Sequence, residues 1–185
     1  MMARRFFTPS APPADPVVSL AEMKLHLRRD DEDDNDAIVA SEAAAVRYIE
    51  GQTNRLLQVR SATLRLDRLP FGRGGVELPG GVVASIDGVT IEGEEFAEDA
   101  FIVLGEAPAR LIPTIDWPAM TDRESYPVEI RYTVGYSEVP ADLIAAIKLV
   151  AGHWYANREA STEKSMASLP MAVDAIVSRY RIMAR

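Results

Sequence analysis

Apolar and polar residues alternate with two different periods along the chain. A helical period, with apolar residues three or four positions apart, covers residues 19–55. A period of two, which is typical of strands, replaces it over residues 56–136, and the helical period returns over residues 137–182. The pattern predicts an α+β fold, in which a helical bundle formed by the N- and C-terminal helices carries a small antiparallel β insertion.

The first helical region has clear start and stop signals. Ser19 and Glu22 have the spacing of a capping box, which marks the start of a helix that ends near residue 29. A second helix is expected from about residue 36 to residue 50, ending at Gly51. An extension to Thr53, followed by Asn54 in the left-handed conformation, is the alternative.

The central region reads as short strands joined by glycine- and proline-rich turns. Leu64 and Leu66 alternate with polar neighbours, so one face of this strand is expected to be buried. Such punctuation is typical of a small antiparallel sheet or barrel. The further β-like runs cover residues 76–78, 82–91, 101–104, 110–112 and 128–136.

The last region predicts two more helices. Pro140 suits the first helical position, and a short final helix begins near Pro170. The apolar stripe of the longer helix consists of Leu143, Ile147, Val150 and Trp154. Neither pair of helices can bury its stripe alone, so we expect the two helical regions to pack together.

The two termini are predicted to differ from this core. Residues 1–18 contain four prolines, which remove backbone donors and fix φ, so we expect a flexible arm, or an arm that orders on a partner. Residues 183–185 form a basic tail. Residues 1–29 carry a net charge of +3 and residues 158–185 carry +2, whereas residues 30–157 carry −13.

The overall composition excludes several classes of protein. The chain has 185 residues, 48% of them hydrophobic and 26% charged, as in ordinary soluble globular proteins. Its net charge of −8 argues against a uniformly basic nucleic-acid binder. It has no cysteine, so a disulfide framework and thiolate chemistry are excluded. No apolar run reaches the ~18 residues of a membrane span, and no signal peptide is visible.

Motifs for catalysis are incomplete. The two histidines, His26 and His153, lie on predicted helices and are interpreted as structural. Residues 72–75 lack the spacing of a dinucleotide fingerprint and are interpreted as a hairpin turn. The acidic residues of 92–99 are expected to be solvated. A hydrolase that uses these carboxylates is the least favoured hypothesis, and we expect neither enzymatic activity nor a cofactor.

One acidic segment resembles a calcium-binding loop. Asp31, Asp33 and Asn35 fit ligand positions 1, 3 and 5 of the template, and Glu42 fits the bidentate position 12. Asp36 occupies position 6, where the sharp turn needs glycine. An acidic turn between two helices is therefore the preferred interpretation. A calcium-binding helix–loop–helix module with a β insertion stays as the alternative function, although no metal ligand is assigned.

Two stretches together resemble the head–tail connector (adaptor) proteins of long-tailed bacteriophages. The first covers residues 18–28 and 43–55, with Asn54 where the family usually has glycine. The second covers residues 132–140 and a following helix. The most specific part of the resemblance is the motif in that helix, formed by His153, Trp154, Tyr155, Asn157, Arg158 and Glu159.

The resemblance implies a structural protein. Family members form a homo-oligomeric ring, usually twelvefold, between the portal protein and the next tail component, a stopper or tail terminator. DNA passes through the lumen of this ring without sequence-specific binding. The expected location is the head–tail interface of a virion or phage-like particle, assembled in the bacterial cytoplasm without a membrane. Among 20 basic residues only three are lysines, and this bias also allows a gene transfer agent from a GC-rich bacterium.

The uneven charge suggests roles for two parts of such a ring. An acidic middle region would repel phosphates and let the duplex slide. The basic C-terminal end is a candidate for docking onto an acidic portal surface through arginine–carboxylate pairs. A frayed terminus is the alternative interpretation. The candidate docking residues are Ile176, Arg179, Tyr180, Arg181 and Arg185.

Overall fold

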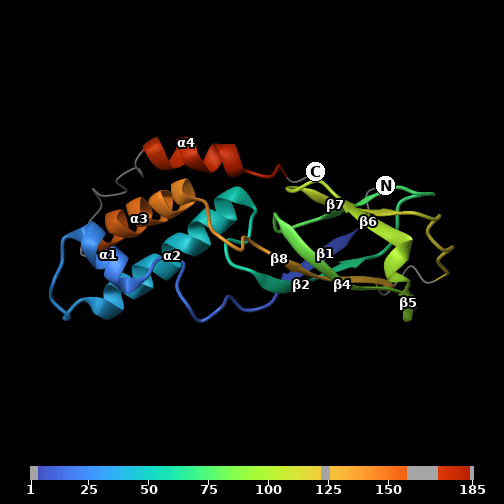
Figure 1. Cartoon of the computed structure of the whole chain (residues 1–185), viewed down its shortest axis with the longest axis horizontal. Coiled ribbons are helices and arrows are strands. Elements are labelled where there is room, and N and C mark those ends of the chain that lie inside the picture. Colours follow the sequence, from blue (N-terminus) through green and yellow to red (C-terminus); the bar gives the residue numbers. More distant parts are fainter. Residues whose placement is uncertain (1–3, 122–125, 158–170, 184–185) are drawn as a thin grey trace. The chain divides into compact units, whose positions relative to one another are not determined.

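The computed structural model describes residues 4–121, 126–157 and 171–183. The chain forms two compact units. A helical unit contains Pro13–Leu57 and Glu138–Arg185, and a β unit contains Met1–Pro12 and Gln58–Ser137. All helices longer than one turn that the structure describes lie in the first unit and all strands in the second, so the fold is α+β, as predicted (Figure 1).

The helical unit brings together helices from both ends of the chain. Its helices are α1 (Leu20–Leu27), α2 (Asn35–Thr53), α3 (Ala141–Ala156) and α4 (Met171–Tyr180). Helix α2 packs against the other three, and α3 also contacts α1 and α4 (Figure 1). In the described part of the chain, none of the helices has the length and apolar character needed to cross a bilayer.

The predicted helix boundaries agree closely with the structure. The Ser19 side chain accepts a hydrogen bond from the Glu22 N–H, and the Glu22 carboxylate accepts one from the Ser19 N–H, so the capping box is present. Helix α2 runs past Gly51 to Thr53, and Asn54 adopts φ 55°, the left-handed conformation of the predicted alternative. Pro140 is the N-cap of α3 rather than its first residue.

The core of the helical unit follows the predicted stripes. Leu143, Ile147 and Val150 are fully buried on α3, whereas Trp154 is only partly buried. Burying side chains of this size contributes about 1.5–3 kcal/mol each. The other large apolar residues of this core are Val18, Met23, Ile38, Val46, Ile49, Leu56, Leu57, Val173, Val177 and Ile182.

The β unit contains two antiparallel sheets. The larger sheet has the strand order β1-β2-β8-β4-β5, and the smaller one has the order β3-β7-β6. The strands are β1 (Arg5–Pro9), β2 (Arg60–Leu66), β3 (Val76–Leu78), β4 (Val83–Ile91), β5 (Glu94–Phe96), β6 (Phe101–Leu104), β7 (Ala109–Pro113) and β8 (Val128–Val134). A single-turn 3₁₀ helix, Glu98–Ala100, precedes β6.

Buried and more exposed side chains alternate along the central strands, and the buried ones form the core of this unit. Strand β8 lies between β2 and β4, and every second residue of β8 is fully buried. Leu64 of β2 lies opposite Ile130 of β8, and both side chains are inaccessible to solvent. Tyr132 is buried as well, but its hydroxyl donates a 2.9 Å hydrogen bond to the carbonyl oxygen of Pro79. This burial raises the pKa of Tyr132.

The expectation of a flexible arm over residues 1–18 is wrong for β1, which pairs with β2 along its whole length. The Ser10 N–H bonds to the Ser61 carbonyl at one end, and the Asp67 N–H bonds to the Arg4 carbonyl at the other. Along an antiparallel pair of strands, opposite residues that are joined by hydrogen bonds alternate with opposite residues that are not. Ser10 and Ser61 are joined, so the next pair, Pro9 and Ala62, is not, and the nitrogen of Pro9 faces the open side of the sheet. Proline costs no ladder bond there, which is why an edge strand tolerates it.

Part of the acidic segment 92–99 forms a strand, which was not predicted from the sequence. Glu92 and Gly93 both have positive φ and form the two-residue turn of a hairpin that joins β4 to β5. Such turns require positive φ at both central positions, and their twist matches that of the strands. Glu94 and Glu95 stay exposed on β5, so the charges are solvated although the backbone is paired.

Candidate functional site

The predicted docking residues lie on the last turns of α4 and on the segment that follows it. Val177 and Ile182 are buried against the helical unit, and Ile176 is partly buried. Arg179 and Arg181 are exposed. Arg185 lies outside the described residues. Four of the five predicted residues are thus brought together on one short stretch of chain.

Arg179 and Tyr180 share one acceptor on α3. The Tyr180 hydroxyl donates a 2.6 Å hydrogen bond to Oδ1 of Asp142, and the Arg179 guanidinium donates one of the same length to Oδ2. Asp142 lies in the first turn of α3, where a negative charge is favoured by the helix dipole. The carboxylate therefore fixes the end of α4 against the start of α3.

The segment after α4 is fixed to the end of α2. Arg181 donates to the carbonyl oxygen of Gln52 (3.0 Å) and to its side-chain oxygen (3.1 Å). The Ile182 N–H donates to the carbonyl of Thr53, and the Asn54 side chain donates to the carbonyl of Ile182, each at 2.8 Å. We use the name C-terminal clasp for residues 179–182 together with their partners Asp142, Gln52, Thr53 and Asn54.

The left-handed Asn54 makes the clasp possible. It ends α2 and leaves the Thr53 carbonyl without a helical partner, because the last carbonyls of a helix have no intrahelical donor. The clasp supplies that donor from Ile182. Arg55, next in the chain, donates to the carbonyl of Tyr180 and lies 5.7 Å from the centre of its ring.

The described residues of the motif on α3 make contacts within the helical unit. Trp154 packs edge-on against Tyr48 of α2, with ring centres 5.6 Å apart. The Asn157 side chain donates to the His153 carbonyl (2.7 Å) and so closes the end of the helix. Both contacts belong to the packing of the helical unit. Arg158 and Glu159, the rest of the motif, lie outside the described residues.

Tyr155 connects the motif to the acidic turn between α1 and α2. Its hydroxyl donates to Oδ2 of Asp34 (2.5 Å) and accepts from Nε of Arg29 (3.1 Å). Arg29 also forms a 2.8 Å ion pair with Asp34 and lies 3.7 Å from Asp31. The hydrogen bond to Tyr155, together with these carboxylates, raises the pKa of Arg29. The acidic turn is thus held by a cation of the chain itself.

The geometry of Glu42 does not fit the calcium template. Its side chain is buried, 4% exposed, and Oε1 accepts a 3.0 Å hydrogen bond from the Val18 N–H. Burial raises the pKa of Glu42, and the backbone hydrogen bonds from Val18 and Val17 partly oppose this. The carboxylate that the template needs as a bidentate ligand is therefore occupied in joining α2 to the segment before α1.

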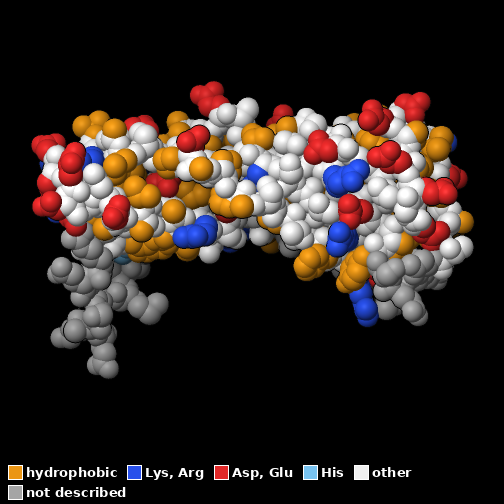
Figure 2. Space-filling view, turned by 90° about the horizontal axis from the view of Figure 1, so that it is seen from below, with side chains coloured by type: hydrophobic (Ala, Val, Ile, Leu, Met, Phe, Trp, Pro, Cys, Tyr) orange, Lys and Arg blue, Asp and Glu red, His pale blue; other side chains and the backbone are white. Residues whose placement is uncertain are grey.

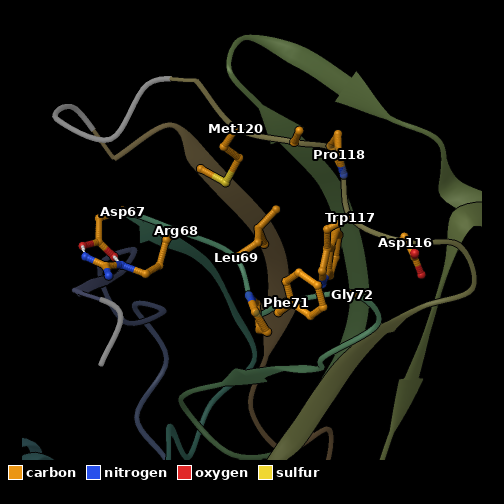
Figure 3. Close-up of a pocket in the computed structure, with 11 residues that line it drawn as sticks. Asp67, Arg68, Leu69, Phe71, Gly72, Asp116, Trp117, Pro118 and Met120 are labelled. Atoms are coloured by element: carbon orange, nitrogen blue, oxygen red, sulfur yellow. Dashed lines mark hydrogen bonds and ion pairs between the residues drawn. The ribbon is translucent and has the colours of Figure 1, made fainter. Parts of the chain in front are cut away.

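A cavity of about 530 Å³ in the β unit was not predicted. Leu69, Phe71, Trp117 and Met120 surround it (Figure 3). The Trp117 indole donates a 2.8 Å hydrogen bond to the Gly74 carbonyl, which holds the ring in the wall. Phe71 is fully exposed. The signal in the sequence was the presence of large apolar residues in segments otherwise typical of turns.

Two charged residues that line this cavity, Asp67 and Arg68, are paired with each other. Arg68 forms a 2.9 Å ion pair with Asp67, and this hydrogen bond lowers the pKa of Asp67 (Figure 3). An apolar wall with a few polar groups suits the side chain of a binding partner. Among the residues that the structure describes, no group of three or more histidine and carboxylate side chains is arranged to hold a metal ion.

Comparison with known proteins gives one family and one group of structures. Residues 119–181 match the family of phage gp6-like head-tail connector proteins. No curated protein matches the chain. A chain in the neck of an empty gene transfer agent (GTA) particle, computed with C6 symmetry, has a TM-score of 0.77 and 24% sequence identity. The match covers 100% of this chain and 97% of that one.

Two further structures agree with this match. A chain in the neck of the native GTA particle, computed with C12 symmetry, has a TM-score of 0.75, 24% identity and the same coverage. So does a chain in the virion of the native gene transfer agent. The predicted resemblance to head–tail connector proteins is therefore confirmed, by the family match over residues 119–181 and by a fold shared over the whole chain with a protein of the GTA neck.

Proposed function

We propose that this chain is a structural head–tail connector subunit, without enzymatic activity, that forms a ring at the neck of a phage or gene transfer agent particle. The observation that carries the proposal is the match over the whole chain to proteins of GTA necks. The family match over residues 119–181 supports it independently.

The ring is proposed to be twelvefold and to lie between the portal protein and the next tail component. The C12 symmetry of the native GTA neck supports this copy number, and the C6 symmetry of the empty neck is compatible with it. In such a ring each subunit contacts its neighbours through two different surfaces, because cyclic assemblies with more than two members need heterologous contacts.

DNA is proposed to pass through the lumen without being held. Acidic side chains outnumber basic ones over the face seen in Figure 2, and residues 30–157 carry a net charge of −13. A negative wall repels phosphates and favours sliding. A ring structure whose lumen is lined mainly by lysine and arginine would contradict this part of the proposal.

The portal-docking surface is proposed to be the C-terminal clasp, through Arg179, Tyr180 and Arg181, together with Ile176 before it and Arg185 after it. Arg179 and Arg181 are held by Asp142 and Gln52 but remain exposed. A guanidinium has five N–H donors, so each arginine keeps donors for a carboxylate of a partner. The clasp then presents preoriented side chains, which reduces the entropy lost on binding.

Electron microscopy of the purified protein, alone and mixed with the portal protein of the same particle, tests the proposed function. Ring-shaped particles of uniform diameter, or rings on the portal, are the expected result. Protein that stays dispersed under both conditions would overturn the proposal.

The docking surface needs variants that leave the fold intact. Deletion of residues 170–185 would also remove buried Val173, Val177 and Ile182, so it is unsuitable. We therefore choose the double variant Arg179→Gln and Arg181→Gln, because the amide removes the positive charge but keeps a side-chain donor for Asp142 and Gln52. Arg47→Gln, on the exposed face of α2, is the control. The double variant should lose portal binding while the control keeps it. Equal binding by both would contradict docking through the clasp.

A further inference from the structure

Strand β6 is an apolar edge strand exposed on both faces. It lies at one end of the smaller sheet and pairs only with β7 among the strands of that sheet. Ile102 and Leu104 are 48% and 53% exposed on one face, and Val103 is 38% exposed on the other. No charged residue interrupts Phe101–Leu104. Long-lived exposure of such an edge favours pairing with another chain.

The direction of the backbone groups of β6 follows from one hydrogen bond. The Thr114 N–H donates to the carbonyl of Ala100 at 2.8 Å, so these two residues form a bonded pair. Bonded and non-bonded pairs alternate along an antiparallel ladder. Ile102 and Leu104 therefore bond to β7, whereas the N–H and C=O groups of Phe101 and Val103 point to the open side.

Features that discourage pairing are present at the other three sheet edges. Strand β1 has Pro9 on its open side and Arg5 at its start. Strand β5 carries Glu94 and Glu95. Strand β3 is only three residues long, and its Glu77 lies 3.9 Å from Arg5. Charges, proline and short length are the usual means of protecting an edge; β6 is short, with four residues, but it has no charge and no proline.

We propose that β6 is a contact strand between neighbouring copies of this chain, in which a second copy adds a strand to the open side of Phe101–Leu104. This inference rests on the proposed ring. In a ring every copy lies beside an identical neighbour, so the neighbour is always present to cover the apolar edge of β6. The contact is heterologous, because pairing of β6 with β6 of a second copy would close a twofold dimer and stop.

Substitutions at Val103 separate backbone pairing from other effects. Val103→Pro removes an N–H that points to the open side, so it costs no bond within the chain. Val103→Thr is the matched control, because threonine keeps the N–H and the β-branched shape. The proline variant should raise the concentration needed for half-assembly by about tenfold or more, and the threonine variant should stay within about threefold.

Assembly is measured by mass photometry, and folding by circular dichroism and thermal melting. Normal assembly of a folded Val103→Pro variant would overturn the contact strand while leaving the proposed function intact. Equal loss of assembly in the threonine variant would overturn backbone pairing. A parent protein that forms only twofold dimers would overturn the heterologous contact.

A photoreactive amino acid at Ile102 gives a second test that does not depend on proline being tolerated. Illumination should produce a covalent dimer, and mass spectrometry should map the captured residue to a segment of the second copy other than β6. Capture of the portal protein but not of a second copy, or of neither, would contradict the inference. If the parent forms open oligomers but no ring, and Ile102 still captures a segment of a second copy other than β6, the contact stands and the proposed function fails.

Discussion

The Tyr180 hydroxyl and the Asp142 carboxylate join the last turn of α4 to the first turn of α3 through a 2.6 Å hydrogen bond. The same carboxylate also accepts from Arg179. The partly buried Tyr180 bond has less competition from water than the exposed Arg179 pair, whose guanidinium side chain is 64% exposed. We therefore expect Tyr180 to contribute more to stability than Arg179.

This difference can be measured by urea denaturation. Tyr180→Phe should lower the free energy of unfolding by about 0.5–1.5 kcal/mol, and Asp142→Ala by about 1–3 kcal/mol because it leaves a donor unpaired. Arg179→Ala should cost about 0–1 kcal/mol, as for other surface ion pairs. Ser178→Ala, on the exposed side of α4, is the control. If Asp142→Ala unfolds at the same urea concentration as the parent, the clasp does not stabilise α4.

Features that depend on neighbours in the sequence could be predicted. The capping box needs only Ser19 and Glu22, three residues apart, and the end of α2 needs only the tolerance of Asn54 for positive φ. The alternation in β2 and β8 likewise marks their buried faces, since side chains of a strand point to opposite sides. These local signals were sufficient for the fold class and for most strand positions.

Features that depend on partners far apart in the sequence could not be predicted from the sequence. Four prolines suggested a disordered arm, but Pro9 is harmless because its nitrogen faces away from β2, and the register that decides this is set by residues 61–67. The arginines of the C-terminal end could be identified as a candidate surface, but their partners Gln52 and Asp142 lie 129 and 37 residues away. The cavity forms where two loops meet.

The buried carboxylate of Glu42 should make stability depend on pH. Burial raises the pKa of Glu42 in the folded state, so its contribution to stability is fully present below the unfolded pKa, about 4.3, and is lost as the pH rises through the folded pKa. Glu42→Gln removes the charge and keeps an acceptor for the Val18 N–H. It should be more stable than the parent at pH 7, with a difference that disappears near pH 4.

Thermal melts of Glu42→Gln and Glu42→Ala across this pH range test the prediction. The alanine variant leaves the buried Val18 N–H without an acceptor, so it should lose about 1–3 kcal/mol of stability. Glu32→Gln provides a control, because it replaces a carboxylate that is exposed rather than buried. A parent that becomes more stable, relative to Glu42→Gln, as the pH rises would refute the assigned cause.

Tyr155 should couple the acidic turn to α3. Its hydroxyl lies between Asp34 and Arg29, so Tyr155→Phe should cost about 0.5–1.5 kcal/mol. Arg29→Met should destabilise the Tyr155→Phe variant less than it destabilises the parent, because the two residues share one hydrogen-bond network. A double-mutant cycle in low and high salt measures this coupling, which should weaken in high salt. Strictly additive effects would mean that the contact carries no coupling energy.

Gly135 and Gly51 should respond in opposite ways to the same substitution. Gly135 has φ 129°, and a Cβ there would overlap the carbonyl oxygen of Gln58, so alanine meets both strain and a backbone clash. Gly135→Ala should lower the free energy of unfolding by about 3 kcal/mol or more. Gly51 lies within α2, and a Cβ there meets nothing within 4 Å.

Gly51→Ala should therefore stabilise the protein by about 0.5–1 kcal/mol, because alanine loses less conformational entropy in a helix. Denaturant titration of both variants against the parent measures the two shifts under identical conditions. The pair also reports on the two units separately, since Gly135 belongs to the β unit and Gly51 to the helical unit. A tolerated Gly135→Ala would mean that the segment from Val134 to Tyr136 can move away from Gln58, and that the bridge between Tyr136 and Gln58 does not hold this part of the β unit.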